Sequence, residues 1–220
     1  MDDNLRIPVV FTPENEPCLG IKSVLWFDRI IVWALAGNKL VAEYTHRHTQ
    51  TLSPLQHAAC QIIPQGINIA LAIRELIRQG YLFPSLVLMR PLIERAAVIS
   101  YLDTHPDACA IWESGWKYSE RPSLGAMLNE ISGGTGIEEA QRLCSAHNHI
   151  VHGDPISSYH NLVHLQDNKV GYASGKILNN PEFCDGISME AQCYLVVLAA
   201  RMSSIFPEVD IPAMETYEDV

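Results

Sequence analysis

The stretch Ser85–Asp103, SLVLMRPLIERAAVISYLD, is the most apolar part of this 220-residue chain. Before its last residue, its only charged side chains are Arg90, Glu94 and Arg95. A helix that is apolar on nearly all sides is typical of a protein core. We therefore expect a helix from about Pro84 to Asp103 in the middle of a helical bundle.

Helical patterns flank this stretch on both sides. Ser53-Pro54-Leu55-Gln56 predicts a helix start, because Ser53 can cap the helix, Pro54 suits its first position and Gln56 can complete a capping box. Apolar residues recur at helical spacing in the expected helices Ile21–Arg47, Pro54–Arg78, Pro106–Tyr118, Pro122–Ile131, Ile137–Val151 and Ser188–Ile205. This pattern predicts an all-α fold, an antiparallel helical bundle with a short loop or β-hairpin before the last helix.

Two local patterns refine this expectation. Thr135 and Glu138 have the spacing of a second capping box, before the helix that starts at Ile137. Between residues 156 and 183 the helical period disappears. A hairpin of 161–166 and 169–172, with its turn at Asp167-Asn168, fits that segment.

Length and composition indicate how many domains the chain has and which classes of partner it can bind. We expect one helical domain over residues 1–206, with its core at about 52–206, and a frayed acidic tail over 207–220. The 48% content of hydrophobic residues excludes disorder for most of the chain. With 15 Lys+Arg against 25 Asp+Glu, the net charge of −10 argues against a surface that coats nucleic acid, although a small basic pocket is compatible with it.

The compartment is predicted from what the sequence lacks. The six cysteines form no C-x-x-C pair, which is typical of reduced thiols. The first residues contain no basic region followed by an apolar run, and the uncharged stretch Thr49–Ile73 is too polar for a membrane span. We expect a cytoplasmic protein without a membrane partner.

The segment Arg142–Asp154, RLCSAHNHIVHGD, is the most promising place for chemistry, because residues 147–152 within it contain three of the nine histidines of the chain. Histidine titrates near neutral pH, and the end of a helix favours its protonated form. Asn148 and His152, four residues apart, share a helix face. They can serve a reaction, or they can cap the helix end. In a third interpretation the segment binds a transition metal, with His160 or His164 as a further ligand to the group His147, His149, His152 and Asp154.

The residues Asn148-His149-Ile150-Val151-His152-Gly153 resemble the R-N-x-x-V-H-G ending of HEPN domains (higher eukaryotes and prokaryotes nucleotide-binding). Arg90-Pro91-Leu92-Ile93-Glu94 is similar to the R-x-L-x-E helix of bacterial HEPN-like proteins. The resemblance covers about Leu52 to Phe206. It implies a homodimeric helical protein of a bacterial stress, toxin or phage-defence system, with an antitoxin or other partner protein in some cases.

The catalytic members of that family are metal-independent endoribonucleases, so the resemblance implies RNA as substrate and no cofactor. It implies that His152 transfers a proton and that Asn148 orients the site. His147 stands where the family has its arginine, and an imidazole cannot form the two-pronged guanidinium contact with phosphate. Arg142 is a candidate substitute further upstream.

Arg90 and Glu94 have two interpretations. In an apolar helix their four-residue spacing allows an ion pair that sets the helix register. Alternatively, Arg90 binds substrate and supplies the phosphate-binding charge that His147 lacks. The sequence therefore leaves three functions open: an endoribonuclease, a non-catalytic module that binds a nucleotide, RNA or protein, and a metal-binding protein.

Overall fold

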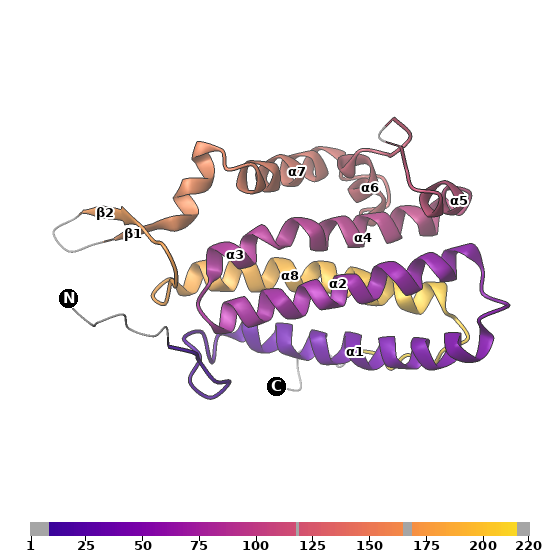
Figure 1. The fold of residues 1–220 in the computed structure, drawn as a ribbon, viewed down its shortest axis with the longest axis horizontal. Coiled ribbons are helices and arrows are strands. Elements are labelled where there is room, and N and C mark those ends of the chain that lie inside the picture. Colours follow the sequence, from indigo (N-terminus) through magenta and orange to yellow (C-terminus); the bar gives the residue numbers. More distant parts are fainter. Residues whose placement is uncertain (1–8, 118, 165–168, 215–220) are drawn as a thin grey trace, which may run out of the picture.

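A computed structural model of the chain describes residues 9–117, 119–164 and 169–214. Over these residues the protein is all-α with one small β-hairpin before the last helix, which confirms the predicted fold class. Four long helices lie side by side (Figure 1). They are α1 (Lys22–His48), α2 (Pro54–Arg78), α4 (Met89–Thr104) and α8 (Pro181–Ile205).

The centre of the bundle is formed by α4 and α8. Helix α8 contacts α1, α2 and α4, and α4 also contacts α2. Side chains of α4 that are at most 1% exposed include Leu92, Ile93, Ile99 and Leu102. Helices α2 and α8 approach closely at Gly66, where an added Cβ would lie 2.4 Å from Leu198 Cδ1. The apolar stretch that predicts the fold is therefore a central element of the core.

Helix α8 is long and apolar enough to cross a membrane, judged by length and composition alone. In the structure, 44% of its most apolar 18 residues are buried inside the protein. Helices that are apolar on most sides occur both in cores and in membranes. The absence of a membrane partner therefore stays a prediction.

The expectation of one helix from Pro84 to Asp103 is wrong. Helix α3 (Leu82–Val87) and helix α4 are separate, with a turn at Leu88 between them. Pro91 accounts for the break, because it has no N–H to donate to the carbonyl of Val87 and its ring crowds that carbonyl.

The last helix begins at Pro181, not at Ser188. Asn180 caps it, because its side-chain oxygen accepts a hydrogen bond from the Phe183 N–H at 3.0 Å. Pro181 occupies the first helical position, which needs no N–H donor. The start signal was present in the sequence but lay outside the expected range.

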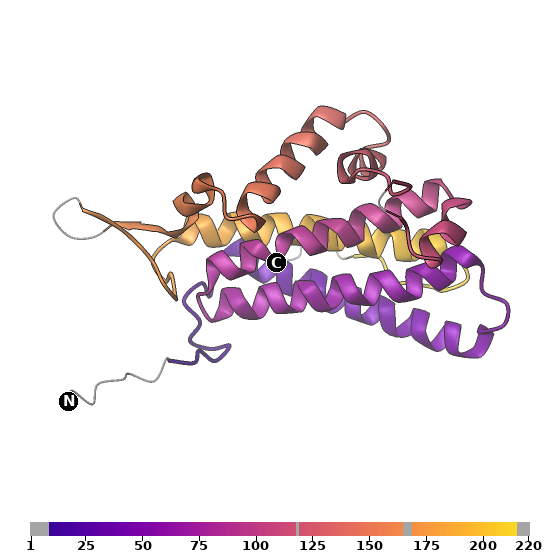
Figure 2. The ribbon, with the colours of Figure 1, turned by 45° about the horizontal axis from the view of Figure 1, so that its top comes forward.

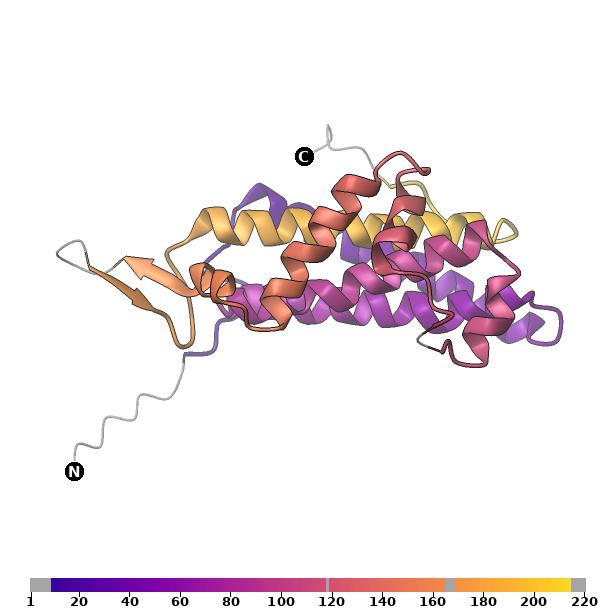
Figure 3. The same cartoon turned by 90° about the horizontal axis from the view of Figure 1, so that it is seen from above.

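A second layer of shorter helices covers α4 (Figures 2 and 3). It consists of α5 (Ala108–Glu113), α6 (Leu124–Ile131) and α7 (Ile137–Val151). Helix α6 packs on α4, and α7 contacts α6, α3 and α4. Helix α5 is shorter than the expected Pro106–Tyr118, and Gly115, in a left-handed conformation with φ 83°, follows it.

The capping box expected before α7 does not form. The N-cap residue is Gly136, which has no side chain to accept a hydrogen bond. The Thr135 hydroxyl donates instead to the Ser132 carbonyl at 2.9 Å. The boundaries of α7 nevertheless agree with the prediction.

A 3₁₀ helix (Pro155–Asn161) and the predicted hairpin connect α7 to α8. The strands β1 (Leu162–His164) and β2 (Val170–Tyr172) are antiparallel, with Val163 opposite Gly171. The expected turn at Asp167-Asn168 lies outside the described residues. The hairpin projects from the end of the bundle where α8 begins (Figure 1).

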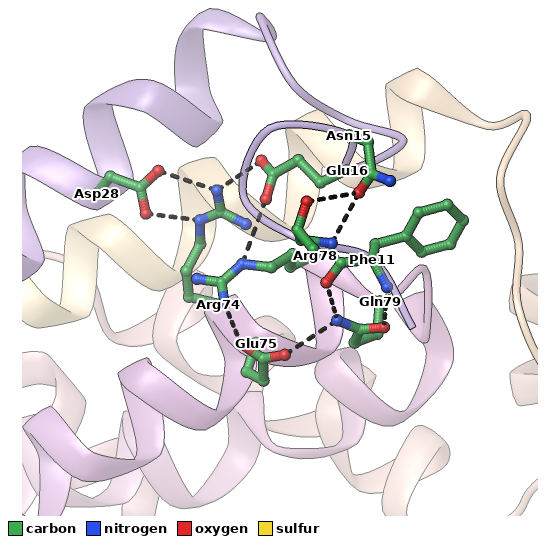
Figure 4. Close-up of polar contacts among 9 residues, drawn as sticks. Phe11, Asn15, Glu16, Asp28, Arg74, Glu75, Arg78 and Gln79 are labelled. Atoms are coloured by element: carbon green, nitrogen blue, oxygen red, sulfur yellow. Dashed lines mark hydrogen bonds and ion pairs between the residues drawn. The ribbon is translucent and has the colours of Figure 1, made fainter. Parts of the chain in front are cut away.

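Buried charges bind the N-terminal segment to the bundle (Figure 4). Arg74 of α2 contacts Glu16 of the N-terminal segment and Asp28 of α1, each at 2.6 Å. The Glu16 side chain is only 1% exposed. Burial disfavours a charged Arg74, but the hydrogen bonds to Asp28 and Glu16 outweigh it and raise the pKa of Arg74 above its ordinary value. Gln79 adds two hydrogen bonds to the backbone of Phe11.

The beginning of the C-terminal tail is packed, which corrects the expectation of a frayed tail for residues 207–214. Val209, Ile211 and Met214 pack against the core. Trp33 of α1 donates its indole N–H to the Pro212 carbonyl at 2.7 Å. Residues 215–220 of the expected tail lie outside the described residues.

Candidate functional site

A cavity of about 350 Å³ lies between α4, α6 and α7, and we call it the α4–α6–α7 cavity. It is lined by Arg90, Ser123, Leu124, Gly125, Gln141, Cys144, Ser145 and Asn148. Two residues singled out from the sequence, Arg90 and Asn148, thus lie at the same cavity although they are 58 positions apart in the chain (148 − 90). Most other lining residues carry hydrogen-bonding side chains.

Arg90 forms the ion pair with Glu94 that their spacing suggests, with 3.3 Å between Nε and Oε1. Its Nη1 atom also donates to the Cys144 carbonyl of α7 at 3.5 Å. The Arg90 side chain is 18% exposed and that of Glu94 27%. The ion pair and the position at the cavity are therefore compatible roles of the same guanidinium.

Glu94 is surrounded by positive charge. Besides Arg90, its carboxylate lies 3.9 Å from Arg95 and 4.0 Å from Arg121. Three guanidinium groups around one carboxylate give a local charge of +2 in a chain of net charge −10. The surface around Glu94 is therefore a local excess of positive charge in an acidic chain.

One face of α7 supplies the polar side of the cavity. Gln141, Ser145 and Asn148 recur at steps of four and three residues, which places them along one helix face. Cys144 lies beside them, and burial raises the pKa of its thiol, although the nearby Arg90 opposes the shift. The cavity therefore presents hydroxyl and amide groups beside a guanidinium.

The start of α6 faces the same cavity. The Ser123 hydroxyl accepts a hydrogen bond from the Ala126 N–H at 3.1 Å and so caps the helix. The first N–H groups of a helix lack partners within it, and the helix dipole makes this end positive. Leu124 and Gly125 bring the first turn of α6 to the cavity wall, which adds to its preference for an anion.

The structure separates His147 and Arg142 from the cavity. His147 is 3% exposed, and its Nε2 atom lies 2.6 Å from Glu190 of α8. Arg142 is 78% exposed and pairs with Glu139 on the outside of α7. Neither residue lines the cavity, whereas Arg90 does.

His149 has the geometry of an oriented proton acceptor. Its Nδ1 atom lies 2.5 Å from Asp154 Oδ2, and its Nε2 atom lies 3.3 Å from the hydroxyl of Ser145, which lines the cavity. A carboxylate at Nδ1 favours the tautomer with the proton on that atom, so that Nε2 can accept one. From the sequence, His152 is the expected proton-transfer residue, and His149 is a candidate metal ligand.

His152 ends α7 as its C-cap residue and is exposed. It stands one helical turn after Asn148, at the end of the face that lines the cavity. Exposed apolar side chains surround this end of the helix, including Val151, Ile156 and Tyr159.

A metal centre finds no support among residues 9–117, 119–164 and 169–214, where no three side chains of His, Cys, Asp or Glu are grouped to hold an ion. His147 and His149 are directed to different carboxylates. His160 stacks on Phe183, and burial together with the charge of His147 lowers its pKa.

Several cavity residues were not recognised in the sequence. Ser145 and Gln141 share the helical face of Asn148, so the spacing of α7 alone would have found them. Ser123 carries no comparable local signal, because only the packing of α6 on α4 brings it to the site.

Comparison of the chain with models of protein families, with curated proteins and with solved structures found no match.

Proposed function

We propose that this protein is a HEPN-like, metal-independent endoribonuclease that acts on single-stranded RNA at the α4–α6–α7 cavity. The observation that carries the proposal is the shared position of Arg90 and Asn148 at a cavity whose wall includes Ser145, the partner of the His149–Asp154 pair. A guanidinium, an amide and an oriented imidazole are the groups that bind a phosphate and move a proton.

The proposed reaction is attack of a ribose 2′-hydroxyl on the neighbouring phosphate. His149 takes the proton from the 2′-hydroxyl while the 2′-oxygen forms its bond to phosphorus. The bond from phosphorus to the 5′-oxygen of the next nucleotide breaks, and His152 gives that oxygen a proton. The products are a 2′,3′-cyclic phosphate and a 5′-hydroxyl.

Arg90, Asn148, the first turn of α6 and Asp154 have defined roles in this scheme. Arg90 and the first turn of α6 stabilise the negative charge on the phosphate oxygens, and Asn148 orients the phosphate through its amide. Asp154 keeps the proton on Nδ1 of His149, as its 2.5 Å contact favours. His147 is not part of the reaction, because its ring is directed to Glu190.

A homodimer in the bacterial cytoplasm is part of the proposal. The exposed apolar side chains Val151, Ile156 and Tyr159 lie next to His152 in the sequence and fit a contact with a second copy. Such a contact would place two cavities close together. An antitoxin or another partner protein would act on the same face.

Cleavage of a short single-stranded RNA in EDTA tests the proposal. We expect His149→Ala and His152→Ala each to lower the rate about 100- to 10,000-fold, the usual contribution of general acid–base catalysis. Arg142→Gln is the matched control, because it removes an exposed charge of α7 that does not line the cavity. Cleavage that stops in EDTA, or that survives both histidine changes, would refute the mechanism.

Ser145 supports a second candidate function, hydrolysis of an ester. Ser145, His149 and Asp154 follow one another as hydroxyl, imidazole and carboxylate in the order of a catalytic triad. The hydroxyl would attack the ester carbonyl and pass its proton through His149 to the leaving alkoxide, and water would then release the acid. Ser145→Ala separates the candidates, because ester hydrolysis needs this hydroxyl and RNA cleavage does not.

Binding without cleavage is the alternative outcome of the same assays. RNA that binds the wild-type protein and remains intact would identify a non-catalytic HEPN-like module. The positive charge around Glu94 accounts for binding in that case too.

A further inference from the structure

A second cavity, of about 400 Å³, lies beside the first and is not used by the reaction proposed above. We call it the tryptophan cavity, because Trp112 and Trp116 line it together with Arg95, Arg121, Gln65 and Glu94. Both tryptophans are partly buried. Both rings pack against the core, Trp116 edge-on to Tyr101 of α4, and they share the cavity wall with two guanidinium groups.

The two cavities meet at the Arg90–Glu94 ion pair. Arg90 lines the α4–α6–α7 cavity, and Glu94 lines the tryptophan cavity. These residues are one turn of α4 apart, a rise of roughly 5–6 Å. A chain of phosphates that reaches Arg90 can therefore continue to the next opening without leaving the surface of α4.

The groups of the tryptophan cavity match the parts of a nucleotide. Aromatic side chains bind nucleobases by stacking, and this mode of binding is tolerant of sequence. Guanidinium groups bind phosphate with two parallel hydrogen bonds. Arg95 already donates to Gln65 at 2.9 Å, which holds its side chain at the wall of the cavity. Arg121 is 42% exposed and its contact with Glu94 is long, at 4.0 Å, so its guanidinium can bind another anion.

We propose that the tryptophan cavity is a nucleotide subsite, in which Trp112 and Trp116 stack on a base of single-stranded RNA and Arg121 binds its phosphate. This inference deepens the proposed function, and it rests on that function for the identity of the ligand as RNA. It implies that the protein binds at least two successive nucleotides. It also implies a preference for single strands, because bases in a duplex are not accessible for stacking.

Binding of a fluorescein-labelled, 2′-O-methylated RNA, measured by anisotropy, tests this subsite without cleavage, since the 2′-oxygen is blocked. We expect Trp116→Ala to weaken binding about 5- to 150-fold, the range found for loss of one stacked base. Trp116→Tyr keeps a stacking ring and should restore most of the affinity. Circular dichroism checks that each variant is folded.

Arg121→Gln provides a second variant that is expected to fold, because this side chain is partly exposed. The slope of log affinity against log salt should decrease by about 0.7, the value for one phosphate contact with a single strand. Arg29→Gln is the matched control, because Arg29 is an exposed arginine of α1 that lines a different cavity. It should leave the slope unchanged.

The possible results separate this inference from the proposed function. Cleavage with unchanged RNA binding in Trp116→Ala and Arg121→Gln would overturn the subsite and leave the nuclease standing. Binding that depends on both residues, without any cleavage, would support the subsite and refute the nuclease. Wild-type protein that binds neither the RNA nor adenosine monophosphate would overturn the subsite.

Discussion

Replacing Arg90 by glutamine tests whether this residue serves stability or ligand binding. The change removes the 3.3 Å ion pair with Glu94. Removing one partner of a fully buried pair usually costs about 3–5 kcal/mol, because the other charge is left buried without a partner. Here Glu94 is 27% exposed and keeps Arg95 at 3.9 Å and Arg121 at 4.0 Å. We therefore expect a loss of only about 1 kcal/mol in the free energy of unfolding.

The effect on ligand binding should be larger than the effect on stability. A hydrogen bond to a charged group contributes about 1.5–3 kcal/mol, which corresponds to an affinity for RNA lowered about 10- to 150-fold. Arg90→Lys keeps the charge and loses the two-pronged geometry, so its affinity should lie between those of the wild type and Arg90→Gln. Urea unfolding followed by circular dichroism gives the stability, and anisotropy of the labelled, 2′-O-methylated RNA gives the affinity.

Glu94→Gln is the matched control for this prediction. It breaks the same ion pair but leaves the Arg90 guanidinium at the cavity. If Arg90 binds phosphate, RNA binding should be unchanged or stronger in Glu94→Gln, because a repelling carboxylate is gone. Equal losses of stability in both variants, with RNA binding unaffected in both, would show that the pair is purely structural and would refute the phosphate-binding role.

Two further predictions concern stability. Arg74→Met leaves the Glu16 side chain, which is 1% exposed, with only its 3.5 Å contact to Arg78. The free energy of unfolding, measured in urea, should therefore fall by about 3 kcal/mol, the lower end of the range for breaking a buried pair. A loss below about 1 kcal/mol would contradict the buried-pair interpretation. The pKa of His160 is lowered in the folded state. As the pH falls below the ordinary histidine pKa of about 6.5, His160 therefore binds protons more readily in the unfolded chain than in the folded protein. Its contribution to stability is present above that pH and is lost as the pH falls. Between pH 7.5 and 5.5 the wild type should lose more stability than His160→Phe, which keeps a ring against Phe183, and equal losses would refute this assignment.

The helices are predictable from the sequence where their signals are local. Helix α2 begins at Pro54 and ends at Arg78 as expected, and Ser53 and Gln56 form both hydrogen bonds of the capping box. These groups are at most three residues apart, so their contacts depend little on the rest of the fold. The division between α3 and α4 was also encoded locally, by Pro91, but the apolar pattern of the whole stretch concealed it.

Parts of the candidate site were local as well. Arg90 and Glu94 are four residues apart on one helix, and His149 and Asp154 are five residues apart at a helix end. Helical periodicity is enough to bring the first pair together. The contact of His149 with Asp154 also depends on the turn at Gly153, which lies just before the aspartate and has a left-handed conformation, φ 69°.

By itself the sequence determined an all-α bundle, most helix boundaries and the pairs of candidate site residues that lie close together along one helix, because spacing along a helix follows from its 3.6-residue period. Only the tertiary structure decided which of these groups meet. Packing of α7 on α4 brings Arg90 and Asn148 to the same cavity, and the position of α7 relative to α8 lets His147 contact Glu190. These contacts join residues more than 40 positions apart, and they depend on how whole helix faces bury their apolar surface, which no local pattern encodes.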